Sequence, residues 1–183
     1  MAWNGIQILD LAGHILHVYT NASGSKGLGG IFGDSWFSAR CPCQFHSRDI
    51  QFKEIYAVLQ AVLRWGNLWN GHKVILHVDN PAIVSALALG SFQNAQVMNM
   101  LRMIVKLAVQ LCFSYSSIWL TSDDNLLADT ASQFEYARLF TTSPSMQKSP
   151  CWPHPQTHGI KLTLTCPTGL HSFYGTALPP RPT

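Results

Sequence analysis

Short apolar segments and longer amphipathic segments alternate along the first 140 residues of the chain. Residues 14–22 (HILHVYTNA) are rich in β-branched and aromatic side chains and end at Asn-Ala-Ser-Gly, which predicts a strand that runs into a turn. Residues 27–41 (GLGGIFGDSWFSARC) predict one or two more strands, broken by glycines. Together these segments indicate an antiparallel meander.

The hydrophobic period changes in residues 48–69, where apolar side chains recur every three or four positions. This spacing predicts an amphipathic helix that ends near Gly66. Residues 72–79 (HKVILHVD) form a nearly continuous apolar run, which is typical of a strand buried on both faces. Asn80 as N-cap and Pro81 at the first helical position then predict a short helix directly after that strand.

Three more elements complete the pattern. Residues 94–111 predict a second long amphipathic helix, and residues 112–121 predict a fifth strand. Residues 122–140 predict a last helix that opens with the capping residues Ser122, Asp123 and Asp124. The order β-β-β-α-β-α-α-β-α indicates an α/β fold in which helices pack against a mixed sheet.

Composition divides the chain near residue 140. A length of 183 residues suits one domain with an extension. Eight of the ten prolines lie beyond residue 140, and no Asp or Glu follows Glu135. We therefore expect a folded domain over residues 1–140 and a Pro-rich, poorly ordered tail or linker over 141–183, in which residues 159–166 (GIKLTLTC) are the one candidate strand.

Net charge, cysteine content and apolar stretches bear on the binding partners and the cellular location that the sequence predicts. The net charge of +3 permits binding to nucleic acid without establishing it. Five cysteines without a framework spacing favour reduced thiols, and therefore a cytoplasmic or nuclear location. Asp10 and His14 interrupt the N-terminal apolar run, so no export signal is predicted. The longest apolar stretch elsewhere, residues 103–115, falls short of the ~20 residues of a membrane span.

Three carboxylates fall at positions where ligands gather in open α/β folds. Glu54 lies on the first turns of the long helix, Asp79 closes the buried fourth strand, and Asp129 lies in the last helix. Converging carboxylates repel one another unless Mg²⁺ or Mn²⁺ neutralises them, and two such ions ~3.5–4 Å apart can activate water for phosphodiester hydrolysis. Helix capping worth ~0.3–1 kcal/mol is the alternative reading of Glu54 and Asp129, whereas Asp79, at the end of a buried strand, needs a partner.

Other motifs favour ordinary structural roles. Cys41, Cys43 and His46 lack the usual zinc spacing, and the glycine-rich residues 24–30 lack the Lys-Ser/Thr ending of a phosphate loop. The tail spacing His154-x-x-x-His158 encloses a proline and no Glu, so it does not match a zinc-peptidase helix. The tryptophans near element ends are interpreted as core or amphipathic edge residues rather than base-stacking residues; these are Trp65, Trp69 and Trp119.

Four sequence blocks, in order, resemble the ribonuclease H domain attached to retrotransposon reverse transcriptases of the DIRS/Ngaro or Gypsy type. The blocks are VYTNASGSKGLGGIF, FKEIYAVLQAVLRW, VILHVDNPAIVSAL and NLLADTASQ, and the agreement spans residues 15–138. In that family the first block reads Tyr-Thr-Asp-Ala-Ser, the second holds a helical Glu, the third ends in Asp-Asn and the last reads Ala-Asp-x-x-Ser-Arg.

The resemblance implies a ribonuclease H-like fold: a five-stranded mixed sheet, three strands antiparallel and then two parallel, flanked by helices. It also implies hydrolysis of the RNA strand of an RNA–DNA hybrid by two Mg²⁺ or Mn²⁺ ions, with a polymerase domain as partner in the parent element. Glu54, Asp79 and Asp129 match three of the four catalytic and metal-ligating acids. Asn21 takes the position of the first acid.

Two departures from the family pattern concern the site. An amide at Asn21 offers one neutral oxygen in place of a charged, bridging carboxylate, so metal affinity should fall and the attacking water should be misplaced. The last block ends in Ala-Ser-Gln instead of Ser-Arg, which removes a basic group. Asp123 and Asp124 precede the last helix and are interpreted as caps rather than as compensating ligands.

Three functions stay open from the sequence. The first is a ribonuclease H domain that cleaves hybrids, and the second is an inactive relic that still binds nucleic acid. The third is a small α/β interaction protein with no nucleic-acid role. Cleavage and binding of a hybrid by the protein, compared with its Asn21→Asp variant, separate the three.

Overall fold

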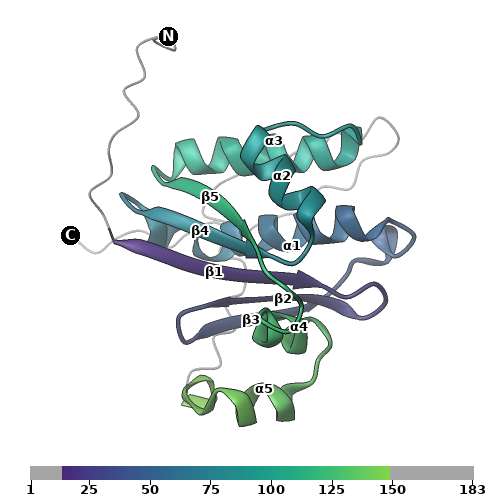
Figure 1. Ribbon diagram of the computed structural model, residues 1–183, viewed down its shortest axis with the longest axis vertical. Coiled ribbons are helices and arrows are strands. Elements are labelled where there is room, and N and C mark those ends of the chain that lie inside the picture. Colours follow the sequence, from purple (N-terminus) through teal and green to yellow (C-terminus); the bar gives the residue numbers. More distant parts are fainter. Residues whose placement is uncertain (1–13, 149–183) are drawn as a thin grey trace, which may run out of the picture. The chain divides into compact units, whose positions relative to one another are not determined.

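A five-stranded mixed sheet forms the centre of the computed structural model, which describes residues 14–148 (Figure 1). Its strands are β1 (Ile15–Ala22), β2 (Gly27–Phe32), β3 (Ser35–Arg40), β4 (Lys73–Val78) and β5 (Ser114–Trp119). The strand order is β3-β2-β1-β4-β5. The pairs β3/β2 and β2/β1 are antiparallel, whereas β1/β4 and β4/β5 are parallel. The predicted sheet of three antiparallel strands followed by two parallel strands is confirmed.

The helices pack on both faces of this sheet. They are α1 (Ile50–Trp65), α2 (Pro81–Leu89), α3 (Ala95–Gln110), α4 (Leu126–Ser132) and α5 (Tyr136–Thr142), with short 3-10 segments at Cys43–Phe45, Gly66–Trp69 and Pro144–Lys148. Helix α1 contacts β1, β2 and α3, while α2 contacts β4 and β5. Helix α4 contacts β1, β2 and β3, and Figure 1 shows α4 and α5 beside β2 and β3.

Capping residues set the helix starts close to where the sequence places them. The Asn80 side chain accepts hydrogen bonds from the first N–H groups of α2, and Pro81 is the first helical residue, as predicted. Asp49 caps α1 in the same way by accepting from Phe52 N at 2.7 Å. Side-chain acceptors of this kind satisfy N–H groups that the helix itself cannot pair.

The predicted single helix over residues 122–140 is wrong, because the chain forms α4 and α5 with a break between them. Phe134 adopts a left-handed φ of 63°. The N–H of Glu135 bonds the carbonyl of Thr130, and the N–H of Phe134 bonds that of Ala131. This pair of bonds is the Schellman ending of a helix, in which the left-handed residue is usually glycine.

The predicted caps Ser122, Asp123 and Asp124 do not begin α4, which starts after Asn125. Asp124 closes a turn instead, since its Oδ2 accepts from Thr121 Oγ1 at 2.7 Å. Asn125 Nδ2 donates to the carbonyl oxygen of Thr20 in β1 at 2.9 Å. That bond fastens the start of α4 to the sheet.

Packing continues beyond the predicted domain boundary at residue 140. That residue falls within α5, and Met146 is buried against a cluster formed by Ile31, Trp36, Leu139 and alanines of α4. Residues 149–183, which include the strand predicted over 159–166, lie outside the described residues.

Gly29 lets α4 approach the sheet closely. Its register partner in β1 is Asn21. A Cβ on Gly29 would collide with the backbone of Ala128 and Ser132 in α4. The missing side chain therefore creates the space in which α4 lies over β2 and its polar residues reach the end of β1.

We predict that Gly29→Ala lowers the free energy of unfolding by about 1–3 kcal/mol, the usual cost of forcing extra atoms into a packed site. Urea unfolding measures the change. Gly24→Ala is the matched control, because a Cβ there meets no atom within 4 Å. Equal stability of the two variants would contradict a tight contact between α4 and β2.

Candidate functional site

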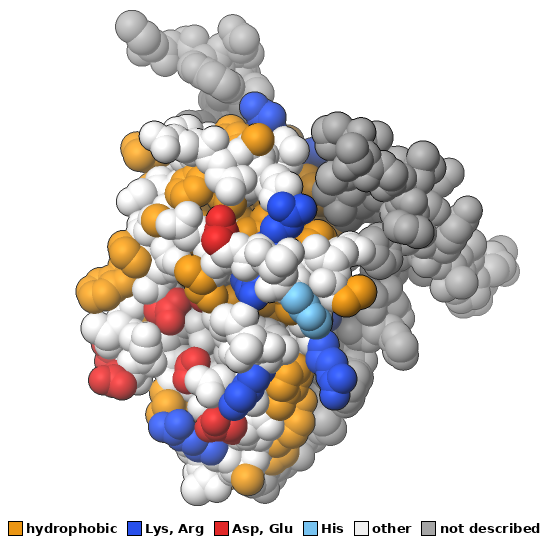
Figure 2. Space-filling view, turned by 90° about the vertical axis from the view of Figure 1, so that its right-hand side faces the viewer, with side chains coloured by type: hydrophobic (Ala, Val, Ile, Leu, Met, Phe, Trp, Pro, Cys, Tyr) orange, Lys and Arg blue, Asp and Glu red, His pale blue; other side chains and the backbone are white. Residues whose placement is uncertain are grey.

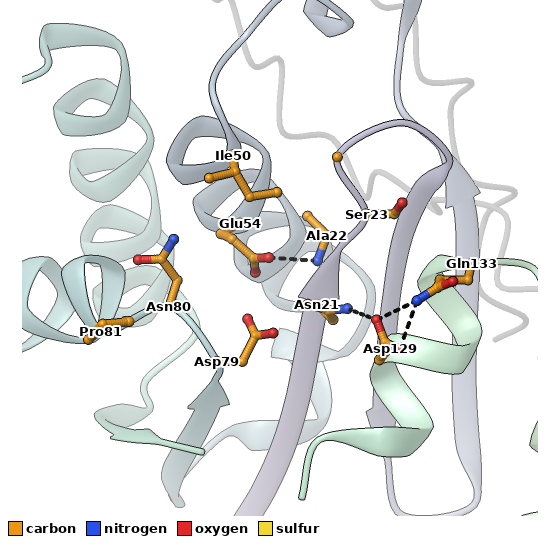
Figure 3. A pocket seen from close by; sticks show the side chains of 11 residues that line it. Asn21, Ala22, Ser23, Ile50, Glu54, Asp79, Asn80, Pro81, Asp129 and Gln133 are labelled. Carbon is orange, nitrogen blue, oxygen red and sulfur yellow. Dashed lines mark hydrogen bonds between the residues drawn. The ribbon is translucent and has the colours of Figure 1, made fainter. Parts of the chain in front are cut away.

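The four residues predicted to form a site line one surface pocket of about 390 Å³. Asn21 comes from β1, Glu54 from α1 and Asp129 from α4, while Asp79 follows β4 directly (Figure 3). Because β1 and β4 are parallel neighbours, their carboxyl ends meet at the same edge of the sheet. The rest of the lining is Ala22, Ser23, Gly24, Ile50, Asn80, Pro81 and Gln133.

Glu54 is the most deeply buried acid of the pocket, with only 2% of its surface exposed. Its Oε1 accepts a hydrogen bond from Ala22 N at 3.0 Å, while its Oε2 has no partner among the described residues. Burial raises the pKa of Glu54 well above its ordinary value of 4.5, and the nearby charges of Asp79 and Asp129 raise it further. The hydrogen bond from the Ala22 N–H lowers this pKa and so opposes the shift. The fold therefore holds this carboxyl at an energetic cost when it is charged.

Lys53, next to Glu54 in sequence, does not neutralise it. Its buried ammonium donates to the carbonyl oxygens of Gly24 at 2.6 Å and of His46 at 3.0 Å. These bonds join α1 to the loop after β1 and to the segment after β3. Lys53 thus helps to fix the pocket wall through two backbone carbonyl groups and forms no ion pair with Glu54.

Asp79 is half-buried and weakly partnered. Ser122 Oγ donates to Asp79 Oδ2 at a long 3.4 Å, which supplies the partner that an acid after a buried strand requires. Burial raises the pKa of Asp79 above its ordinary value, the Ser122 hydroxyl opposes this shift, and Asp129 adds to it. Trp119, half-exposed at the end of β5, donates from its indole Nε1 to the Asp79 carbonyl oxygen at 3.1 Å.

Asp129 lies between two amide side chains (Figure 3). Asn21 Nδ2 donates to Asp129 Oδ1 at 2.7 Å. Gln133 Nε2 donates to Asp129 Oδ1 at 3.0 Å and to Oδ2 at 2.8 Å. Asn21 is itself buried, and the same Nδ2 donates to Ser132 Oγ at 3.2 Å.

This donor set does not fit two divalent cations. Three amide N–H hydrogen bonds already reach the oxygens of Asp129, so a cation at this carboxylate would have to compete with them for its oxygen lone pairs. Asn21 turns its nitrogen toward Asp129, as the acid requires. Within residues 14–148, no three His, Cys, Asp or Glu side chains are grouped closely enough to hold an ion.

Gln133 lines the pocket and Ser122 contacts one of its acids, Asp79, but neither was singled out as a site residue from the sequence. Gln133 follows Asp129 by four positions, and residues at this spacing share one face of a helix. That spacing was a signal for Gln133. Ser122 reaches Asp79 from a separate loop, and no local spacing indicates that contact.

Of the other sequence motifs, Cys41, Cys43 and His46 are absent from the pocket lining, whereas Gly24 of the glycine-rich segment is part of it. The spacing His154-x-x-x-His158 lies outside the described residues. Cys41 is buried, Cys43 is exposed, and the His46 ring bonds the Cys41 carbonyl at 2.8 Å. Trp65 and Trp69 are buried in the core, as predicted, and Trp119 occupies an edge position. No helix among residues 14–148 is both long and apolar enough to span a bilayer.

Comparison with known proteins shows a distant structural likeness and no match in sequence. No family model matches the chain, and no curated protein sequence matches it. A solved ribonuclease H1 isolated from compost by a metagenomic approach, LC11-RNase H1, is similar with a TM-score of 0.45 and 13% sequence identity. The match covers 68% of this chain and 96% of that one. This likeness is too distant to assign an activity to the chain.

The raised pKa of Glu54 predicts a pH dependence of stability. Because the folded state holds this proton more tightly, the free energy of unfolding should fall as the pH rises from about 4.5 through the folded pKa. Glu54→Gln keeps an oxygen for the Ala22 N–H but carries no charge. We expect it to flatten this fall and to raise stability at neutral pH by about 1–3 kcal/mol.

Urea unfolding from about pH 4, near the ordinary pKa of a Glu side chain, up to about pH 8 measures this effect. Glu135→Gln is the control, because Glu135 is partly exposed and its contacts are surface ion pairs. A small slope due to Asp79 should persist in Glu54→Gln. Equal slopes in the wild type and in Glu54→Gln would contradict the charged-state cost assigned to Glu54.

Proposed function

We propose that this chain is a retroelement-derived, ribonuclease H-like domain that binds RNA–DNA hybrids and has lost most or all of its hydrolytic activity. In the parent element, such a domain works beside a reverse transcriptase polymerase domain. The observation that carries the proposal is the 2.7 Å hydrogen bond from Asn21 to Asp129, because it occupies the site with an amide where a carboxylate is needed.

The loss of activity follows from the chemistry of Asn21. Its side chain supplies one neutral oxygen, and the nitrogen beside that oxygen faces Asp129. A two-metal site depends on anionic oxygens that neutralise and bridge the ions. The three remaining acids, Glu54, Asp79 and Asp129, keep their places in the pocket without completing such a site.

Binding to nucleic acid is supported by the groups around the pocket. The first residues of two helices, Ile50 of α1 and Pro81 of α2, are part of its lining. The partial positive charge of a helix N-terminus favours phosphate oxygens, whereas the caps Asp49 and Asn80 already accept from first-turn N–H groups of these two helices. Lys26, about half-exposed, adds a cation next to Gln133 at the pocket wall.

Surface charge predicts modest and salt-sensitive affinity. On the face drawn in Figure 2, basic and acidic side chains are interspersed rather than gathered by sign. The net charge of the whole chain is only +3. Contacts to a phosphate backbone weaken steeply as salt rises, so binding should be measured first at low salt.

The test combines binding and cleavage of a labelled RNA–DNA hybrid by the full chain with Mg²⁺ or Mn²⁺. We expect the wild-type protein to shift the hybrid and leave it intact. Asn21→Asp should restore measurable cleavage, because it returns an anionic ligand to the position of the first acid. The double variant Asn21→Asp/Asp79→Asn is the control, and it should lose that cleavage again.

Two results would contradict the proposal. Cleavage by the wild-type protein that disappears in Asp79→Asn would identify an active nuclease. An unchanged mobility of the hybrid at micromolar protein and low salt would remove the nucleic-acid role and favour an α/β interaction protein.

A further inference from the structure

Asp129 has the densest set of side-chain donors in the pocket. Each of its oxygens accepts from an amide nitrogen, at distances between 2.7 and 3.0 Å. Hydrogen bonds to an ionised acceptor at these lengths are stronger than neutral ones. Asn21 and Gln133 together therefore satisfy the oxygens of this carboxylate with hydrogen bonds, in the place where a bound cation would otherwise contact them.

The Gln133 amide is oriented from both of its ends. Its oxygen accepts from Lys26 Nζ at 3.4 Å, and its nitrogen faces both oxygens of Asp129. The reverse orientation would place the amide oxygen against a carboxylate and the NH₂ group against an ammonium. The Lys26 charge thus favours the amide orientation that donates to Asp129.

The Asn21 amide is held by α4. Its nitrogen reaches two acceptors on that helix, Asp129 Oδ1 and Ser132 Oγ. The Ser132 hydroxyl hydrogen is directed to the Asp129 backbone oxygen at 2.8 Å, which leaves the Ser132 oxygen free to accept from Asn21. The orientation of Asn21 is therefore fixed by three polar groups of one helix.

We propose that Asn21 and Gln133 form an amide clamp, defined as these two residues, which replaces divalent cation at Asp129 and lets the pocket persist without metal. The inference rests on the proposed function for the identity of the site. The inference implies that Asn21 accounts for only part of the difference from a metal-binding site, and that Gln133 accounts for the rest. A cation that approaches Asp129 must also compete with the two hydrogen bonds from Gln133.

The two residues should act non-additively, because both contact the same carboxylate. Asn21→Asp alone places a second carboxylate against Asp129, which is unfavourable until a cation separates the charges. Gln133→Met removes the other donors while keeping a side chain of similar length. The double variant Asn21→Asp/Gln133→Met should therefore bind metal better than the single variant Asn21→Asp does.

The test is thermal unfolding of the full chain with Mn²⁺ and with a chelator, in the absence of nucleic acid. Gln110→Met is the control, because Gln110 is exposed at the end of α3. For the wild type and for this control, the unfolding temperature with Mn²⁺ should equal the unfolding temperature with chelator. Asn21→Asp should unfold about 2–4 °C lower with chelator, a shift typical of a modest destabilisation in a chain of this size. Mn²⁺ should reverse that loss, and the double variant should show the largest Mn²⁺ shift.

Two results would overturn the clamp. One is a Mn²⁺ shift of the wild type as large as that of Asn21→Asp, and the other is an equal Mn²⁺ shift in the single and double variants. If Asn21→Asp does not fold, Asn21→Ala/Gln133→Met removes the same donors without adding charge, and it must respond to Mn²⁺ more than the wild type does. A failure to bind hybrid with this metal pattern intact would reject the proposed function alone.

Discussion

A hydrogen bond from Asn21 to Asp129 joins the end of β1 to α4, and the geometry of the pocket depends on this contact. It forms because Gly29, the register partner of Asn21, leaves room for the α4 backbone on the sheet. The bond from Asn125 to the Thr20 carbonyl fixes the start of the same helix. A side chain at Gly29 would move α4 and separate the residues that line the pocket on this side.

The pocket contains two kinds of carboxylate. Asp129 accepts hydrogen bonds from two amide side chains. Glu54 is buried, one of its oxygens has no partner among residues 14–148, and burial raises its pKa. In a site for two-metal hydrolysis, all of the acids would need to be charged and free to ligate the ions. The amides pair the oxygens of Asp129 without changing its charge, and the raised pKa of Glu54 favours the uncharged form of that side chain. The arrangement therefore supports the proposal that the domain binds nucleic acid and has lost two-metal chemistry.

Periodicity and turn residues were sufficient to predict the strands and the first three helices, whereas the arrangement of three antiparallel strands followed by two parallel ones was predicted from the family resemblance. Asn80 and Pro81 mark the start of α2 through local chemistry, and the structure agrees. The break after α4 escaped prediction because its left-handed residue is Phe134, where a glycine would have been the usual signal. The burial of Met146 was not predicted either, because it depends on contacts with residues of β2 and β3 that are distant in sequence.

The pocket itself was predictable to a similar degree. The resemblance indicated Asn21, Glu54, Asp79 and Asp129, and the structure brings all four to one place. The role of Asn21 as a donor was not predictable, because the direction of its amide is set by Asp129 and Ser132 across the sheet. Gln133 was treated as the loss of a basic group, while its contacts with both oxygens of Asp129 appear only in the folded chain.

A crystal structure of the wild-type protein grown with Mn²⁺ and measured for anomalous scattering tests the central claim most directly. We predict no manganese peak at Asp129, with Asn21 Nδ2 still within hydrogen-bond distance of Asp129 Oδ1. A manganese ion coordinated by Asp129, with Asn21 turned so that its oxygen faces the metal, would contradict the account.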